Sequence, residues 1–399
     1  MEEFLSRTYE PMYMFQYLSD TDLVALSKVY PRFLNNECFW SNRYFNMTKQ
    51  LVSLQENNDS VWDHNLELHP GLTWQDSYFY SLMDIPKYND ILYITGNLRL
   101  FQYLQYHVNL FPTVYNINIA AENGHLDVLE YLRRLDPKNL PNVDGANLAA
   151  QYGHLHILKY LKRFDIHPDV EGANWAAQHG HLDLLQYLEK LDPKVRPDRF
   201  GANGAARNGH FHILKYLEHL DPKVRPSVHG ANRAAEYGLL NVLKYLGRFK
   251  PKICPDTDGA NRAARNGHLD VLIYLEQLDP KVRPDVDGAN AASQSGHIDI
   301  LMYLEQLEPK VRPDKIGANL ASWGGHLDVL QYLEQLDPKI RPDVSGANYA
   351  AGYGCLKILK YLEQLDPKIR PDIYGARSAE INGHTDVLEY LRQFGVVLH

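Results

Sequence analysis

The chain has 399 residues, of which 45% are hydrophobic and 23% are charged, and its formal net charge is −8. This apolar content is ample for a folded protein, and the lack of a basic excess predicts that nucleic acid is not a partner. The 3 scattered cysteines exclude a disulfide framework or a cysteine metal cage, and the lack of a run of about 18 apolar residues excludes a membrane-spanning helix and a membrane partner.

The first residues, Met1-Glu2-Glu3-Phe4, have neither the basic segment nor the apolar segment of a secretory signal peptide. The low cysteine content also suits a reducing compartment. We therefore expect a cytoplasmic, intracellular protein.

Residues 1–87 differ from the rest of the chain because they contain no repeat and carry 12 acidic against 6 basic residues. Within them, apolar residues recur at helical spacing between Leu23 and Phe33. The pattern predicts a small helical domain over residues 1–50, followed by a helical connector over residues 51–87.

The order Asp-Leu, Leu-Ser-x-Val, Arg-Phe and Trp within residues 17–40 resembles an F-box. Residues 73–78 (Thr-Trp-Gln-Asp-Ser-Tyr) resemble the Trp-x-x-x-Tyr segment that often follows one, although the usual Leu-Pro-x-Glu opening is absent. The resemblance implies docking on a Skp-type adaptor of a cullin-based ubiquitin ligase. The alternative is a helical cap domain in which the same residues form a core stripe. The residues that would contact the adaptor are Leu18, Leu23, Leu26, Val29, Phe33 and Trp40.

The rest of the chain repeats one short unit at a constant period. Gly-Ala-Asn, or a close variant of it, starts nine copies, and seven of the eight intervals are 29 residues while the first is 27. A period of this size predicts a solenoid, because units this small must stack to bury their apolar faces. Solenoids typically serve as binding surfaces. The starting glycines are Gly145, Gly172, Gly201, Gly230, Gly259, Gly288, Gly317, Gly346 and Gly375.

Each unit reads as helix, turn, helix and short loop. In one copy, Asp256 stands where a side chain either caps a helix or forms an Asx turn, and the pattern does not separate the two. A short helix around Ala263-Ala264 should end at Gly267 in the left-handed conformation. The second helix should bury a leucine stripe over residues 269–278 and end at Asp279-Pro280.

Residues 263–272 (Ala-Ala-Arg-Asn-Gly-His-Leu-Asp-Val-Leu) are similar to the core of an ankyrin repeat. The unit departs from that family by lacking the Thr-Pro-Leu-His start and by being shorter than the usual length of about 33 residues. The resemblance implies an all-α, helix–turn–helix solenoid with a capping repeat over residues 88–115 and ten ankyrin-like repeats over residues 116–399. The combination with an F-box-like domain also resembles proteins encoded by large DNA viruses, which implies a viral protein acting on host proteins.

Histidines in the Gly-His step and tyrosines in the second helix recur once per repeat. A regular ladder does not converge on one ion, so we expect structural roles, no metal site and no cofactor. The chain has no Ser-His-Asp set, phosphate-binding glycine loop or His-Glu-x-x-His motif, so we expect no catalytic residues and no enzyme. The basic residues of the Asp-Pro-Lys-Val/Ile-Arg loops predict ion pairs between repeats, with a charged strip for a partner as the alternative.

Positions that vary between repeats are free to encode a partner, because packing positions must stay constant. The varying residues flank the Ala-Ala step, on a helix that the ankyrin resemblance places on the concave side. Residues four apart share a helix face, which pairs Trp175 with His179, Arg233 with Tyr237, and Tyr349 with Tyr353. Trp, Tyr and Arg are common in binding hot spots. The predicted partner-binding residues are Trp175, His179, Arg207, Arg233, Tyr237, Arg262, Trp323, Tyr349 and Tyr353.

The function that these observations favour is a protein–protein interaction adaptor. In the specific form, a target lies on the concave face while the F-box-like end recruits the ubiquitin ligase, so the protein is a substrate receptor. The alternative is a plain ankyrin-type scaffold, or a self-assembling structural protein, with no link to a ligase.

Overall fold

The computed structural model describes residues 91–96, 98, 102 and 112–395. The chain divides into two compact units, which are described separately: unit 1 contains Met1–Ala173 and Gln186–Val195, and unit 2 contains Asn174–Leu185 and Arg196–His399. The F-box-like segment, the connector and most of the predicted capping repeat fall outside the described residues. The same holds for the six predicted adaptor-binding residues, Leu18, Leu23, Leu26, Val29, Phe33 and Trp40.

The described residues form helices and contain no strand, which confirms the all-α solenoid. Two elements lie outside the repeated pairs: α7 (Ile91–Thr95) and the short 3₁₀ helix η2 (Lys162–Phe164). None of the described helices combines the length and the apolar character that crossing a bilayer would require. The first helices of the pairs are α9 (Val114–Glu122), α11 (Val143–Gln151), α13 (Val170–His179), α15 (Arg199–Arg207), α17 (Val228–Glu236), α19 (Thr257–Arg265), α21 (Val286–Ser295), α23 (Lys315–Gly324), α25 (Val344–Gly352) and α27 (Ile373–Ile381).

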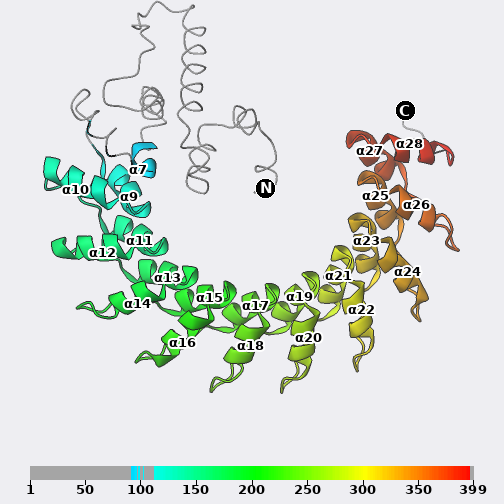
Figure 1. The fold of residues 1–399 in the computed structure, drawn as a ribbon. Coiled ribbons are helices and arrows are strands. Elements are labelled where there is room, and N and C mark those ends of the chain that lie inside the picture. Colours follow the sequence, from blue (N-terminus) through cyan, green and yellow to red (C-terminus); the bar gives the residue numbers. More distant parts are fainter. Residues whose placement is uncertain (1–90, 97, 99–101, 103–111, 396–399) are drawn as a thin grey trace, which may run out of the picture. The chain divides into compact units, whose positions relative to one another are not determined.

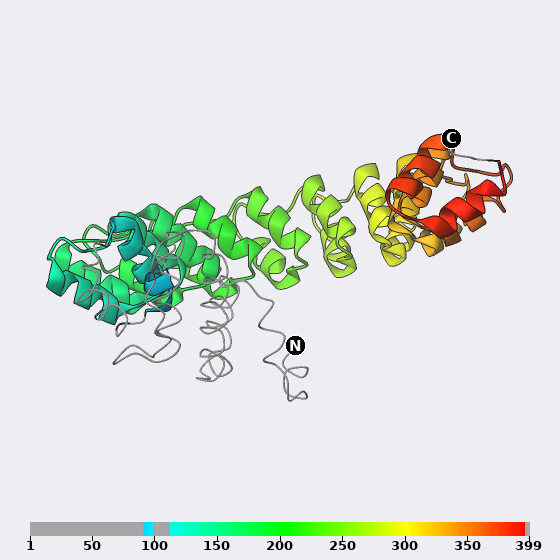
Figure 2. The ribbon, with the colours of Figure 1, turned by 90° about the horizontal axis from the view of Figure 1, so that it is seen from above.

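The second helix of each pair follows its first helix after a tight turn. Within unit 2 the first helices stand side by side in one row and the second helices form a second row on the outer side of it (Figure 1), and the pairs follow one another in chain order (Figure 2). The second helices are α10 (Leu126–Leu135), α12 (Leu155–Leu161), α14 (Leu182–Leu188), α16 (Phe211–His219), α18 (Leu240–Leu246), α20 (Leu269–Glu276), α22 (Ile298–Glu305), α24 (Leu327–Gln335), α26 (Leu356–Leu362) and α28 (Thr385–Arg392).

The residues at the helix ends act largely as the sequence predicts. Asp256 is a true N-cap of α19, because its side chain accepts from the backbone N–H groups of Asp258 and Gly259. Gly267, in the turn after that helix, has φ +82°, a left-handed conformation that favours glycine. A cap of this kind starts most first helices, although the N-cap Ser227 of α17 makes no such bond, and the glycine turns the chain into the second helix.

The core lies between the two rows and is built mainly from alanine and leucine. Ala263 and Ala264 are fully buried, which lets neighbouring first helices approach closely. In α20 the buried residues are Val271, Leu272 and Leu275. The predicted leucine stripe is therefore partly wrong: its two ends, Leu269 and Leu278, are only half-buried, because α20 begins at the first and ends two residues before the second.

An asparagine ladder joins each first helix to the next. In unit 2, Asn232 Oδ1 accepts from the backbone N–H of Asp256 at 3.0 Å, while its Nδ2 donates to the Asp256 carboxylate at 2.8 Å. The backbone bond recurs at nine steps, with distances of 2.8–3.2 Å. One side chain thus satisfies the free N–H of the following cap and orients its carboxylate. The asparagines are Asn118 and Asn147 in unit 1, and Asn174, Asn203, Asn232, Asn261, Asn290, Asn319 and Asn348 in unit 2.

The ladder explains the glycine that opens each Gly-Ala-Asn step. A Cβ atom added at Gly259 would lie 2.5 Å from Asn232 Oδ1 and 2.8 Å from the Pro255 side chain. No side chain fits in that space without moving the asparagine. The repeated glycine therefore reflects close approach between repeats rather than a turn conformation.

The outer loops carry a second device, a clamp between a glutamate, a lysine and an arginine. Arg283 donates to both carboxylate oxygens of Glu276, at 2.6 and 2.7 Å, and Lys281 donates to the same carboxylate at 2.7 Å. Arg283 Nη1 also donates to the backbone carbonyl of Glu308, in the loop of the following repeat, at 2.7 Å. The ion pairs therefore lie within each repeat, and a guanidinium-to-carbonyl bond makes the link between repeats.

The glutamate and the arginine of the clamp occur together or not at all. Where the clamp is missing in unit 2, Gly247 and Cys254 replace the two residues. There the Tyr245 and Phe249 rings meet edge to face at 5.0 Å, and the preceding Arg225 lies 4.9 Å from the Phe249 ring centroid. An aromatic contact and a cation–π contact take the place of the clamp at this step.

We predict that Asn232→Ala lowers the free energy of unfolding by about 1–3 kcal/mol, because two hydrogen bonds are lost and the Asp256 N–H loses its partner. Chemical denaturation followed by circular dichroism measures the change. Gln331→Ala, an exposed amide in α24, is the control and should alter the value by less than about 0.5 kcal/mol. Equal effects of the two substitutions would contradict the ladder.

We predict that acid weakens the stack. Bonding to arginine lowers the pKa of Glu276 and of Glu305 from 4.5 to about 2. A lowered pKa in the folded state means that the stabilisation is complete above pH 4.5 and is lost as the pH falls toward 2. Urea midpoints between pH 6 and pH 3 should therefore fall, and should fall less in the double variant Glu276→Gln/Glu305→Gln. Parallel profiles for the two proteins would show that the clamps do not cause the acid sensitivity.

Candidate functional site

The varying positions of the first helices in unit 2 lie outside the buried alanine pair. In α25, Ala350 and Ala351 are fully buried, whereas Tyr349 is 47% exposed and Tyr353, just after the helix, is 58% exposed. The predicted binding residues are all accessible and all belong to unit 2. Those that are exposed are His179, Arg207, Tyr237, Tyr349 and Tyr353, and those that are half-buried are Trp175, Arg233, Arg262 and Trp323.

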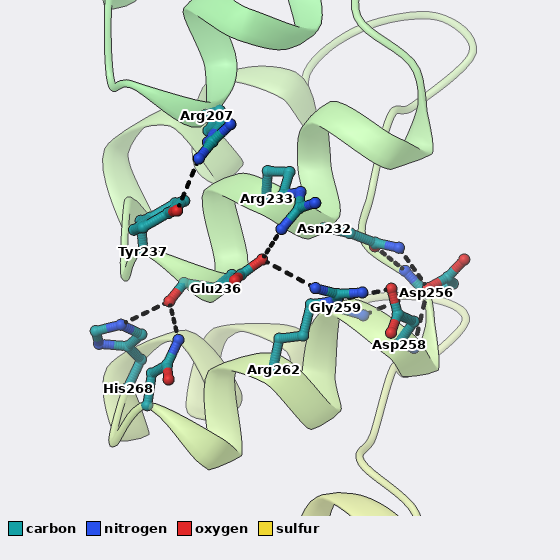
Figure 3. Close-up of polar contacts among 11 residues, drawn as sticks. Arg207, Asn232, Arg233, Glu236, Tyr237, Asp256, Asp258, Gly259, Arg262 and His268 are labelled. Carbon is teal, nitrogen blue, oxygen red and sulfur yellow. Dashed lines mark hydrogen bonds and ion pairs between the residues drawn. The ribbon is translucent and has the colours of Figure 1, made fainter.

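Polar contacts cross the neighbouring helices α15, α17 and α19 (Figure 3). Glu236, at the end of α17, accepts from Arg233 in the same helix at 2.8 Å and from Arg262 in α19 at 3.2 Å. Arg262 also donates to Asp258 at 3.0 Å. The Glu236 side chain is only 18% exposed, so this carboxylate is the half-buried centre of the network.

Two further arginines, at the ends of α15 and α19, have no carboxylate partner among the described residues. Arg207 in α15 donates to Tyr237 Oη at 3.2 Å, and its guanidinium carbon lies 5.6 Å from the Tyr237 ring centroid. Arg265, at the end of α19, is exposed and makes no hydrogen bond or ion pair with any residue in the described part of the chain. We call Arg207, Arg233, Arg262 and Arg265 the arginine patch.

An aromatic cluster lies on α23 and α25, further along the same row. The Trp323 and Tyr353 rings meet edge to face, with centroids 5.5 Å apart and planes at 80°. Tyr349 occupies the varying position before the alanine pair in α25. We call Trp323, Tyr349 and Tyr353 the aromatic cluster.

The side chains pair differently from the prediction, because the contacts run between repeats rather than along one helix. Arg233 does not pair with Tyr237, whose partner is Arg207, 30 residues earlier. Tyr353 likewise contacts Trp323, at the same separation, rather than Tyr349. Tyr237 and Tyr353 are the C-cap residues of α17 and α25, so each lies just beyond its helix, within reach of the preceding repeat. Only the pair on α13 is held within one helix, where His179 Nδ1 lies 2.9 Å from the backbone carbonyl of Trp175.

In unit 2 the position after the first helix also joins repeats where it is asparagine, as at Asn208, Asn266 and Asn382. Asn266 Nδ2 donates to the Glu236 carbonyl at 2.8 Å, and His268 Nε2 lies 3.0 Å from the same oxygen. This histidine therefore bonds a backbone group of the preceding repeat. Among the described residues, no three His, Cys, Asp or Glu side chains gather in a way that could hold a metal ion.

Sequence reasoning missed two residues of this face. Glu236 stands at a varying position that holds residues as different as glutamine, arginine and tryptophan in other repeats, and only the structure shows that it receives two arginines. Arg265 was visible as a varying residue, but its lack of a partner appears only in three dimensions. Opposite charges in neighbouring repeats, 26 residues apart in Glu236 and Arg262, are the signal that could have found the network.

No family model matches this chain, and no curated protein is similar to it. Among solved structures, two crystal structures of the pentatricopeptide repeat protein PPR10 in complex with an 18-nt psaJ RNA element are similar, each with a TM-score of 0.43 and 13% sequence identity. The similarity covers 96% of this chain and 63% of the other, so this chain spans less than two thirds of that protein. The class of protein that the fold defines is a helical-repeat solenoid.

One prediction is not kept. The charge balance led us to expect no nucleic-acid partner, whereas the similar solved structure is a complex with RNA. Net charge alone does not support that exclusion, because it averages over the whole molecule. The acidic N-terminal residues lower the total charge, and the loop clamps pair lysine and arginine with glutamate. The arginine patch, in contrast, places four cations on three neighbouring helices.

We predict that Tyr349→Ala and Tyr353→Ala each change the free energy of unfolding by less than about 1 kcal/mol, because about half of each side chain is exposed. Ala350→Leu is the contrasting variant, and overpacking of this buried position should cost about 1–3 kcal/mol. Urea denaturation compares the three. A large loss of unfolding free energy in either tyrosine variant would show that this tyrosine contributes to the packing of the stack rather than to a free surface.

Proposed function

We propose that this protein is a binding scaffold that captures a protein target on the first helices of unit 2. The observation that carries the proposal is that each first helix has two kinds of position, one that packs against neighbouring repeats and one that is accessible. Buried alanine, glycine and asparagine keep the repeats together, while the accessible positions change from repeat to repeat and hold Trp, Tyr and Arg. These residue types supply large contact areas and dominate binding hot spots.

The specific form of the proposal is a substrate receptor acting in the cytoplasm of the cell in which it is made or of a host cell. Its support is the F-box-like order of residues 17–40 together with the ankyrin-like repeat core, as found in proteins of large DNA viruses. The F-box-like segment would dock on a Skp-type adaptor, and the array would hold the target for ubiquitin transfer. A plain scaffold or a self-assembling protein would use the same face without an adaptor.

Two binding experiments with the full-length chain test the two parts of the proposal, adaptor docking and target binding. Purified recombinant Skp-type adaptor should bind the wild type and should not bind Leu23→Asp/Leu26→Asp. A folded wild type that fails to bind the adaptor removes the receptor form and leaves the plain scaffold.

For the target, we predict that Tyr349→Ala/Tyr353→Ala reduces the recovered protein from native-cell extract at least fivefold. Met302→Ala is the matched control, because Met302 is 49% exposed on the second helix α22. Extract treated with ribonuclease separates the classes of partner. Capture that depends on RNA, or that is equal in all variants, would contradict a protein target on this face.

A further inference from the structure

The row of first helices in unit 2 has two chemically different ends. The arginine patch occupies α15, α17 and α19, and the aromatic cluster occupies α23 and α25. Between them, α21 places only Ala291, Gln294 and Ser295 at the varying positions. At the varying positions, the two recognition elements are thus separated by residues without charge or large side chains.

The arginine patch has more positive charge than its own acids neutralise. Its four guanidinium groups face two carboxylates, those of Glu236 and Asp258. Arg207 and Arg265 make no ion pair with any described residue. A partner that brings carboxylates to these two arginines would form charge-assisted, bidentate hydrogen bonds.

The aromatic cluster suits an apolar anchor. Tyr349 and Tyr353 expose about half of their surfaces, and the edge-to-face contact holds the Trp323 and Tyr353 rings in position. Rings that are already ordered lose little side-chain freedom when a partner binds. An aliphatic or aromatic side chain would bury its surface there without a charge partner.

The distance between the two ends sets the length of the partner segment. Arg262 and Tyr349 occupy the same position three repeats apart. Packed helices stand about 8–10 Å apart, so the two residues are about 24–30 Å from each other. An extended chain covers about 3.3 Å per residue, so the gap corresponds to about seven to nine residues.

We propose that the partner of this face is an extended acidic peptide segment of a protein, with an apolar side chain about eight residues away from its carboxylates. The carboxylates lie on the arginine patch and the apolar side chain lies on the aromatic cluster. This inference rests on the proposed function and names the chemistry of the target.

A protein segment fits this surface better than a nucleic acid strand. A strand carries a phosphate at every nucleotide and needs cations along its whole path. Here the varying positions of α21, α23 and α25 carry no charged residue, and two carboxylates lie inside the arginine patch. Charge confined to one end and apolar surface at the other end match a segment whose chemistry changes along its length.

Fluorescence anisotropy with the full chain tests the inference. The probes are fluorescein-labelled peptides with Asp-Glu-Asp-Glu and Leu-Phe separated by two, six or ten Gly/Ser residues, in both orders, together with a 14-nucleotide single-stranded RNA. We expect the six-residue spacer to bind most tightly in one of the two orders, with an affinity that falls as salt rises.

Matched variants test whether the arginine patch and the aromatic cluster each contribute to peptide binding. Arg265→Glu and Tyr353→Ala should each raise the Kd at least tenfold, and Arg265→Glu should also reduce the salt dependence. The controls are Lys357→Glu and Met302→Ala, exposed residues of the second helices, which should leave the Kd unchanged. Equal affinities for all spacers, unchanged affinity in Arg265→Glu, or binding of the RNA alone would overturn the inference. If the native target is captured and Tyr349→Ala/Tyr353→Ala loses it while Arg265→Glu retains it, the acidic segment is wrong and the proposed function stands.

Discussion

The hydrogen bonds between one asparagine and the cap of the following helix are the interaction on which the rest of the stack depends. Asn232 and its counterparts satisfy a backbone N–H that a helix start leaves free, and most also hold the cap carboxylate. The bond draws neighbouring first helices so close that only glycine fits opposite the asparagine and only small residues, alanine or serine, stand between the helices. The residues that are constant among the repeats therefore reflect one constraint, the close approach of neighbouring first helices.

On the outer side, charged residues of the loops link neighbouring repeats. Each clamp neutralises its lysine and arginine within the repeat and sends one guanidinium N–H to the next loop, as Arg283 does. Glutamate and arginine are lost together after α18, where Phe249 makes aromatic contacts in place of the ion pair. Most basic loop residues are paired in this way, whereas Arg207 and Arg265 on the first helices make no ion pair with any described residue.

The sequence was sufficient to predict what depends on one repeat alone. The period, the two helices and the left-handed Gly267 all follow from local chemistry, and the structure confirms them. For Asp256 the sequence left a helix cap and an Asx turn open, and the structure shows the cap. It was insufficient for contacts between repeats. Pairing by helical spacing misassigned Tyr237 and Tyr353, because their partners lie 30 residues away in the neighbouring helix. The role of the Gly-Ala-Asn asparagine was missed for the same reason, since a residue that is the same in every repeat does not reveal which neighbouring repeat it contacts.

Amide hydrogen exchange resolved residue by residue tests the central claim most directly, namely that an asparagine in one repeat holds the cap of the next. The comparison is between the wild type and Asn290→Ala, read at the amide of Asp314, which bonds Asn290 Oδ1 at 3.0 Å. The account predicts slow exchange of this amide in the wild type and exchange at least tenfold faster in the variant, with the amide of Asp256 unchanged because its asparagine is intact. Equal exchange of the Asp314 amide in the two proteins would show that the stack is held by apolar packing alone.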